Sequence, residues 1–165
     1  MSDTEDSLES QADYNVYPVK EDPLKIKYPP VGEKLISPPF TMAIISSRHT
    51  GKTVLAQNLF TRKFPFYGDV FDRIVLISGT LKADRSARYL VNHIGEENCF
   101  EEYDDRIIEG LVEQQKDVEP EDQQKILLIA DDIPSLGASQ TCKLYTLSTT
   151  ARHHNISICY ISQLL

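Results

Sequence analysis

One stretch of sequence decides the fold, and it reads Ile44-Ile45-Ser46-Ser47-Arg48-His49-Thr50-Gly51-Lys52-Thr53. The apolar run Met42–Ile45 at its start predicts a buried β-strand, and the apolar spacing of Val54–Phe60 behind it suits a helix. A strand, a polar loop, Gly-Lys-Thr and a helix, in that order, are the context of a phosphate-binding loop. Backbone N–H groups at the loop and at the helix N-terminus would point at the phosphate, and the helix dipole would add to the attraction.

Two side chains of this loop have specific expected roles. Lys52 would reach the β- and γ-phosphates, and the Thr53 hydroxyl would ligate magnesium. The full motif begins with a glycine, which permits a tight turn, but here the first position is Ser46. We expect a nucleotide to contact the whole loop, which consists of Ser46, Ser47, Arg48, His49, Thr50, Gly51, Lys52, Thr53 and Val54.

Length and composition favour a single globular domain and argue against a membrane-spanning or disulfide-rich protein. A chain of 165 residues with 41% hydrophobic residues can build one domain with a real core. The sequence has no apolar run near the ~20 residues that a membrane span needs, and no signal peptide is visible. The cysteines, Cys99, Cys142 and Cys159, are odd in number and far apart. This pattern favours reduced thiols in an intracellular setting, and it argues against a disulfide framework or a CxxC metal site.

The negative charge is concentrated at the N-terminus. Residues 1–22 hold seven acidic residues against one lysine, so they contribute −6 of the net charge of −8. We interpret them as a disordered acidic arm, followed by a proline-rich extended segment in which 24–26 form a short edge strand. The predicted organisation is therefore an arm and extended segment over 1–37 and one domain over 38–165. The body carries little charge, so nucleic acid is not excluded as a partner, although no basic run indicates a binding patch.

Apolar runs and helical periodicities alternate along the domain. Strands are predicted at 41–46, 74–77, 126–130 and 156–161, and helices at 52–62, 84–94, 104–117 and 139–149. The run Ile126–Ala130 is apolar throughout, as a strand covered on both faces must be. The sequence therefore predicts an α/β fold in which helices cover both faces of a mainly parallel sheet.

Two carboxylates follow the apolar strand 126–130. Ligands of open α/β sheets bind beyond the carboxyl ends of the strands, so Asp131 and Asp132 should face the same crevice as the phosphate loop. One would hold magnesium through water, and the other would act as a general base on the attacking water. Asp104 and Asp105 form another acidic pair, but they sit at a predicted helix start, where negative charge suits the dipole.

The last predicted strand has functional candidates at both ends. Gln163 follows it and would face the crevice, where it could sense the γ-phosphate or orient water. Arg152 precedes it and would lie far from its own site, so it could face a neighbour's nucleotide in a ring. We expect His153 and His154 to be exposed turn residues rather than metal ligands, because adjacent side chains on a turn point apart.

Three motifs together resemble the poxvirus-type genome-packaging ATPases of large DNA viruses, within the FtsK–HerA superfamily of ring-forming P-loop motors. The motifs are Pro39-Phe40-x-Met42 leading into the loop, Ile126-Leu127-Leu128-Ile129-x-Asp131-Asp132, and Arg152-His153-x-Asn155-x-Ser157-Ile158 ending in Gln163. The resemblance implies a RecA/ASCE-like P-loop NTPase fold, a three-layer sandwich. Family members continue with at least one further strand, so the sheet is expected to lack the C-terminal strand or strands.

The resemblance also implies residue roles and a function. Lys52 and Thr53 match the Walker A residues, Asp131 and Asp132 the Walker B pair, Gln163 the polar sensor and Arg152 a candidate trans finger. The expected catalytic residues are then Lys52, Asp132, Gln163 and Arg152, and the expected magnesium ligands are Thr53 and Asp131. The implied activity is hydrolysis of ATP with Mg²⁺ to drive double-stranded DNA into a capsid. The expected partners are DNA without sequence preference, copies of the chain in a ring, and capsid or portal proteins. The expected location is the assembly site in the host cytoplasm, or the virion.

Two other functions remain open at this stage. One is a truncated or degenerate homologue that binds nucleotide without turnover. The other is a small P-loop kinase or GTPase, although the sequence has no guanine-specificity motif and no arginine-rich lid.

Overall fold

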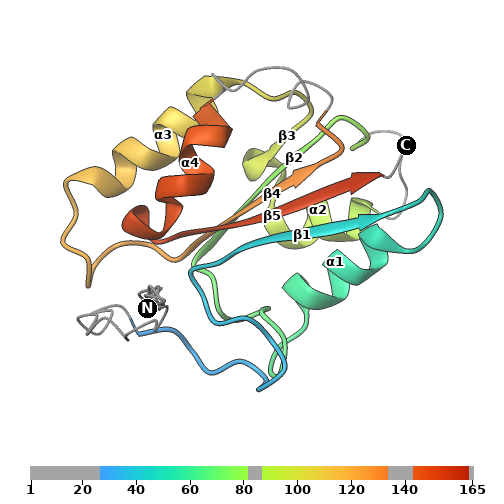
Figure 1. The fold of residues 1–165 in the computed structure, drawn as a ribbon, viewed down its shortest axis with the longest axis horizontal. Helices are drawn as coiled ribbons and strands as arrows, with labels where there is room; N and C mark the ends of the chain where they lie inside the picture. Colours follow the sequence, from blue (N-terminus) through green and yellow to red (C-terminus); the bar gives the residue numbers. More distant parts are fainter. Residues whose placement is uncertain (1–26, 82–86, 134–142, 164–165) are drawn as a thin grey trace, which may run out of the picture.

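A parallel β-sheet forms the centre of the molecule (Figure 1). The computed structural model describes residues 27–81, 87–133 and 143–163. Its sheet has five strands in the order β1-β5-β4-β2-β3, and each pair of neighbours is parallel. The strands are β1 (Thr41–Ser46), β2 (Arg73–Ser78), β3 (Cys99–Phe100), β4 (Ile126–Asp131) and β5 (Ile156–Gln163).

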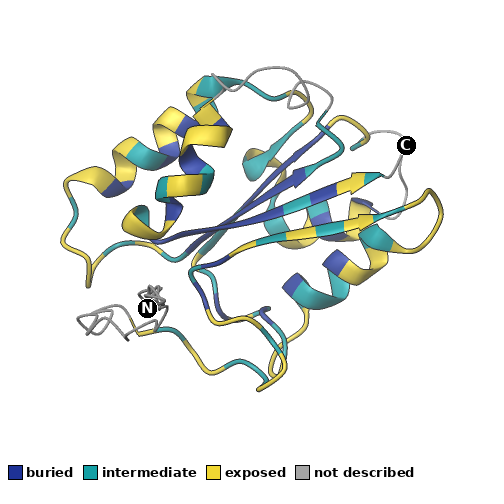
Figure 2. Cartoon of the chain, viewed as in Figure 1, coloured by how far each residue is buried: buried dark blue, intermediate teal, exposed yellow. Residues whose placement is uncertain are grey.

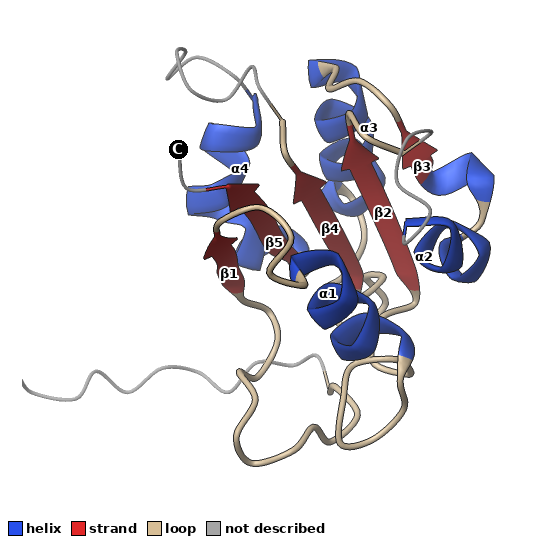
Figure 3. Ribbon diagram, turned by 90° about the vertical axis from the view of Figure 1, so that its right-hand side faces the viewer, coloured by secondary structure: helices blue, strands red, loops and turns tan. Residues whose placement is uncertain are grey.

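Helices cover both faces of this sheet, which makes three layers (Figure 3). One face packs against α1 (Lys52–Thr61) and α2 (Ala87–Ile94), and the other against α3 (Asp105–Lys116) and α4 (Lys143–Thr150). Two 3₁₀ turns, η1 (Glu96–Asn98) and η3 (Ala151–His154), lead into β3 and β5. The predicted α/β class with a parallel sheet is confirmed.

Two hydrophobic cores, one on each side of the sheet, hold the layers together (Figure 2). Successive side chains of a strand point to opposite faces, so each buried strand contributes to both cores. On β4, Ile126, Leu128 and Ala130 face α3 and α4, whereas Leu127 and Ile129 pack with α1 and α2. All five of these side chains are at most 2% exposed. Burial of one large aliphatic side chain contributes about 1.5–3 kcal/mol to stability, so β4 anchors the sheet.

The prediction that β1 is buried is wrong. β1 is the edge strand, because β5 is its partner and no second partner exists within the described residues. Its side chains alternate between exposed and half-buried, and Ile45 is 54% exposed. The apolar run alone could not reveal this position, since edge and central strands of a parallel sheet share that composition.

Other boundaries differ in smaller ways. β5 extends two residues beyond the predicted end, so Gln163 belongs to the strand, and the short β3 was not predicted. The predicted helix 104–117 is α3, and Asp104 caps it by accepting a hydrogen bond from the Arg106 backbone N–H. The acidic arm, the predicted strand 24–26 and the beginnings of the helices predicted at 84–94 and 139–149 lie outside the described residues. None of the described helices has the length and apolarity to cross a membrane.

Candidate functional site

The carboxyl ends of β1, β5 and β4 bring the predicted site residues to one edge of the sheet. Ser46 at the end of β1 is in register with Gln163 at the end of β5. Asp131 at the end of β4 is in register with Ile161 of β5. The backbone N–H of Asp132 donates to the Ile161 carbonyl over 2.9 Å. Parallel pairing therefore places the loop, the two aspartates and the glutamine next to one another.

The phosphate loop turns sharply before α1. His49 and Gly51 have φ angles of 59° and 89°, in the left-handed region. In the described part of the chain, no side chain caps the first turn of α1 and that turn holds no acidic residue. The first backbone N–H groups of a helix have no intrahelical acceptor and lie at the positive end of the helix dipole, the arrangement that binds phosphate.

Lys52 lies back over its own loop. Its Nζ donates to the Ser46 carbonyl over 3.2 Å and to the Ser47 carbonyl over 3.0 Å. These bonds hold the ammonium group at the mouth of the loop, beside the start of α1. Ser46 and Ser47 thus act through their carbonyl oxygens, and neither of them lines the hollow itself.

Ser46 does not need the flexibility of glycine. Its φ is not among the positive values of the chain, so a side chain is tolerated there without strain. Its hydroxyl is hydrogen-bonded to the Thr50 hydroxyl, and Thr50 Oγ1 also donates to the Ser47 carbonyl over 2.8 Å. The serine therefore ties the two ends of the loop together.

A hollow of about 580 Å³ opens between the loop and the strand ends. It is lined by Arg48, His49, Thr50, Gly51, Lys52, Thr53, Val54, Thr80, Asp131, Asp132 and Gln163. Most of the residues predicted to hold a nucleotide and to act on it are thus gathered in one place. Three predicted residues do not line it: Ser46 and Ser47, which contact Lys52 through their carbonyls, and Arg152, which belongs to η3 at the opposite end of β5.

Both aspartates are held by polar side chains. Ser78, buried at the end of β2, donates its hydroxyl to Asp131 Oδ2 over 2.9 Å and also lies 3.2 Å from the Thr80 hydroxyl. Asp132 has a φ of 42° and accepts a hydrogen bond from Gln163 Nε2. Ser78 and Thr80 were not predicted as site residues. Their only signal was the polar triplet Ser78-Gly79-Thr80 closing an apolar strand, and such endings are common.

Comparison with known protein families decides what this chain is. Residues 31–165 match the family described as "Poxvirus A32 protein". The chain belongs to this family. A32 proteins are packaging ATPases, so the resemblance seen in the sequence is confirmed, and ATPase function is supported at the level of the family.

The A32-family chain was also compared with curated proteins and with solved structures. No curated protein matches it. Among solved structures, it is similar to ATPases 2 and 3 of Thermomonospora curvata EccC in complex with a signal sequence peptide. That similarity has 15% identity and a TM-score of 0.49, and it covers 76% of this chain. The chain spans about a quarter of the EccC chain, since 25% of the latter is covered.

The donor set of the A32-family site fits magnesium. Mg²⁺ usually keeps several waters and binds through one or two protein oxygens plus substrate phosphates. The Thr53 hydroxyl and the Asp131 carboxylate, which both line the hollow, supply such oxygens. As in other Mg²⁺ sites, waters and nucleotide phosphates would complete the coordination.

Cys159 lies in β5 below the site and is fully buried. Burial, and secondarily the charge of Asp131, raises the pKa of its thiol to about 12. A thiol with that pKa stays protonated near neutral pH and is a poor nucleophile. Cys159 is therefore a core residue of the A32-family domain, in line with its place in an apolar run.

The turn before β5 carries the candidate arginine. Arg152 and His153 are exposed and His154 is half-buried, so the two histidines differ in environment. Burial, and then the neighbouring His153, lowers the pKa of His154. Asn155 ends the turn at a φ of 53°, and its amide donates to the carbonyls of Gln123 and Gln124 over 3.3 and 3.1 Å. Tyr28 donates its hydroxyl to the Asn155 side-chain oxygen, so the turn is firmly anchored.

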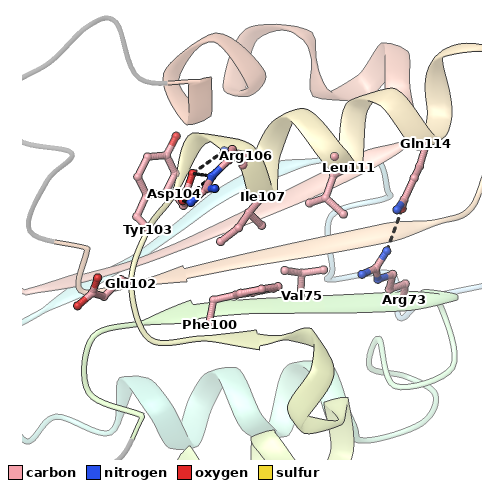
Figure 4. A pocket seen from close by; sticks show the side chains of 11 residues that line it. Arg73, Val75, Phe100, Glu102, Tyr103, Asp104, Arg106, Ile107, Leu111 and Gln114 are labelled. Carbon is pink, nitrogen blue, oxygen red and sulfur yellow. Dashed lines mark hydrogen bonds and ion pairs between the residues drawn. The ribbon is translucent and has the colours of Figure 1, made fainter.

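A second hollow of about 580 Å³ lies between α3 and the strands β2 and β3, away from the phosphate loop (Figure 4). Its apolar lining comes from both sides: Val75 and Phe100 from the strands, and Leu111 from α3 opposite them. Arg73 donates to Gln114 at one end, and the Arg106–Asp104 ion pair stands at the other. It contains none of the predicted catalytic residues, and it is separate from the hollow beside the phosphate loop.

Proposed function

We propose that this A32-family protein is an ATP-hydrolysing motor that moves double-stranded viral DNA into the capsid. One observation carries the proposal: the phosphate loop, both aspartates and Gln163 line a single hollow at the carboxyl edge of the sheet. Family membership supports ATPase function, and the chemistry of these side chains supports hydrolysis at this site.

Each side chain has a distinct role in the proposed reaction. Lys52 would leave the carbonyls of Ser46 and Ser47 and neutralise charge developing between the β- and γ-phosphates. Thr53 and Asp131 would hold Mg²⁺, which supplies electrostatic stabilisation of the phosphates when bound. Asp132 would accept a proton from the attacking water, and Gln163 would orient that water or sense the γ-phosphate.

The proposed motor acts as a ring of identical subunits. Arg152 is exposed and remote from its own hollow, which suits an arginine that reaches the nucleotide of a neighbouring subunit. The proposed cargo is DNA bound without sequence preference, and the proposed partners are capsid or portal proteins. The motor would act at the assembly site in the host cytoplasm, or in the virion.

Replacement of Lys52 tests the activity. We expect Lys52→Ala to abolish ATP hydrolysis and to weaken ATP binding without always removing it, because the ammonium acts mainly on charge that develops in the transition state. The measurement is phosphate release with and without double-stranded DNA, in preparations cleared of contaminating ATPase. An unchanged kcat in Lys52→Ala would disprove the assignment of the loop.

The wild-type protein separates the competing functions in the same assay. Hydrolysis that double-stranded DNA stimulates supports the motor. Tight ATP binding with no turnover in any condition would identify a nucleotide-binding homologue without activity. Preference for GTP, or transfer of phosphate to a nucleoside, would identify a P-loop GTPase or kinase.

A further inference from the structure

A chain of hydrogen bonds crosses the nucleotide hollow from the phosphate loop to the end of β4. Arg48 Nε donates to Gln163 Oε1 over 2.8 Å. Gln163 Nε2 in turn donates to Asp132 Oδ2. The three residues come from the loop after β1, from the end of β5 and from the position after β4, and all three line the hollow that also contains Lys52.

The two hydrogen bonds can run in only one donor-to-acceptor direction, from Arg48 through Gln163 to Asp132. A guanidinium can only donate hydrogen bonds, and an ionised carboxylate can only accept them. The amide of Gln163 lies between the two, so its oxygen must face Arg48 and its NH₂ group must face Asp132. Without Arg48, the amide would lose the partner of its oxygen and could turn, and an oxygen turned toward Asp132 would repel the carboxylate.

The backbone of Asp132 is already fixed. Its N–H is bonded to the Ile161 carbonyl, and its φ of 42° is in the left-handed region. What remains to be set is the direction of the carboxylate, and the contact from Gln163 sets it. The orientation of the proposed base therefore depends on a residue of the phosphate loop.

We propose that Arg48 is a positioning residue for hydrolysis: it fixes the amide of Gln163 and, through it, the carboxylate of Asp132. The inference rests on the proposed ATPase function. Nε is one of five N–H donors of the guanidinium, and in the described part of the chain no ion pair involves Arg48. The other N–H donors of Arg48 can therefore bind a phosphate in the same hollow. One side chain would then contact both the nucleotide and Gln163.

Kinetics of four variants test this role. We expect Arg48→Ala to lower kcat by about 10²-fold, the order of loss that small misplacements of catalytic groups cause, while affinity for a non-hydrolysable ATP analogue changes only a few-fold. In the background of Gln163→Ala, the further substitution Arg48→Ala should change kcat less than 3-fold, because the group that Arg48 orients is already gone. Arg48→Lys should recover part of kcat, since an ammonium can donate one bond to the Gln163 oxygen.

Arg62→Ala is the matched control for loss of a positive charge. Arg62 follows α1, its guanidinium lies 4.9 Å from the centre of the Phe66 ring, and it is not among the residues lining the hollow. Its removal should leave kcat unchanged. Equal losses from Arg48→Ala in the presence and absence of Gln163, or weakened nucleotide affinity with unchanged kcat, would overturn the positioning role and leave Arg48 as a phosphate contact.

A second measurement does not depend on hydrolysis. The side-chain NH₂ signals of Gln163 in ¹⁵N NMR spectra, assigned by their loss in Gln163→Ala, should move toward those of a free glutamine in nucleotide-free Arg48→Ala. Unchanged signals would show that Arg48 does not orient the amide, and would overturn the inference. If the wild-type protein does not hydrolyse ATP, the proposed function fails, and these signals still decide whether Arg48 holds Gln163.

Discussion

His49 is the residue at which the phosphate loop first enters the left-handed region. A residue with a side chain loses about 1–2 kcal/mol in that conformation, and His49 adopts it with a φ of 59°. The glycine of the common motif stands three positions earlier, where this chain has Ser46. Ser46 has no positive φ, and its hydroxyl is bonded to that of Thr50. In this loop the left-handed backbone conformation is therefore needed at position 49 and not at position 46.

Two substitutions at position 49 test this placement. We expect His49→Gly to be more stable than His49→Ala by about 1 kcal/mol, because only glycine adopts positive φ without a steric cost. Both variants lose the imidazole, so the difference between them isolates the backbone. The measurement is urea unfolding followed by circular dichroism. Equal stability, or greater stability of the alanine variant, would contradict the left-handed conformation.

Among the elements, α3 contains a glycine that its surroundings do not require. Gly110 lies within the helix and is exposed, and no atom of the described residues is within 4 Å of where a Cβ would stand. Glycine inside a helix costs about 0.5–1 kcal/mol relative to alanine, since the unfolded chain loses more freedom.

Gly110→Ala should therefore stabilise the domain by about 0.5–1 kcal/mol in the same urea assay. The two positions should show opposite preferences: glycine should be more stable than alanine at position 49, and alanine more stable than glycine at position 110. A destabilised Gly110→Ala protein with unchanged helix content would show that something outside the described residues packs against this part of α3.

Two amide side chains, Asn155 and Gln115, anchor the turn η3. Asn155 is fully buried, and its amide satisfies the carbonyls of Gln123 and Gln124. Gln115 completes the network, donating to the Gln124 and His154 carbonyls over 2.6 and 3.1 Å. This network joins the turn that carries Arg152 to the loop between α3 and β4.

Asn155→Ala should destabilise the protein by about 3 kcal/mol, because the Gln123 carbonyl and the Tyr28 hydroxyl lose their Asn155 partner and alanine is placed at a positive φ. Asn155→Gly loses the same hydrogen bonds without the strain, so it should be about 1 kcal/mol less destabilising. The denaturation midpoints of the two variants measure the loss of the hydrogen bonds, and the difference between them measures the strain of alanine at a positive φ. A loss below 1 kcal/mol in Asn155→Ala would mean that water replaces the amide easily.

On the scale of the whole molecule, the two ends of β5 hold groups that cannot meet on one nucleotide. The strand has eight residues, which corresponds to roughly 26 Å at ~3.3 Å per residue. Gln163 lines the hollow at one end, and Arg152 lies beyond the other. If Arg152 serves catalysis, it serves a neighbouring subunit.

Mixing two inactive proteins tests that arrangement. Arg152→Ala and Lys52→Ala should each be inactive alone, since an arginine finger contributes about 10³–10⁵ in rate where one is known. Mixed rings contain interfaces where an intact loop faces an intact arginine, so ATPase activity should partly return.

The control mixture combines Lys52→Ala with the double variant Lys52→Ala and Arg152→Ala. It contains no intact loop, so it should remain inactive. Inactivity of the first mixture, with both proteins assembled into rings, would argue against the trans role. Full activity of Arg152→Ala alone would make Arg152 a structural residue.

The sequence predicted the fold class and the central strands because long apolar runs, such as Ile126–Ala130, reflect burial on both faces. It could not predict the place of β1 in the sheet, since strand order depends on long-range pairing rather than on composition. It missed β3 because two residues form no pattern. The rule for strand ends predicted that Asp131, Asp132 and Gln163 would face the same crevice as the phosphate loop, and all three line the hollow with Lys52, while their chemical roles stay predictions. The bonds from Ser78 to Asp131 and from Arg48 to Gln163 were not predictable, because they depend on side-chain geometry across separate elements.

The pairing of β1 with β5 also sets an order for biosynthesis. Thr41 is in register with Ile158, and Ser46 with Gln163, so the partner of the first strand is the last described strand to leave the ribosome. The phosphate loop is synthesised within about the first third of the given sequence. The strand before it, β1, pairs with β5 in the described part of the chain, so it cannot join the sheet until residues 156–163 have emerged. During translation β2, β3 and β4 can associate first, and the proposed nucleotide site is completed once β5 has emerged. Ligand binding to ribosome-bound chains should therefore begin only at late lengths.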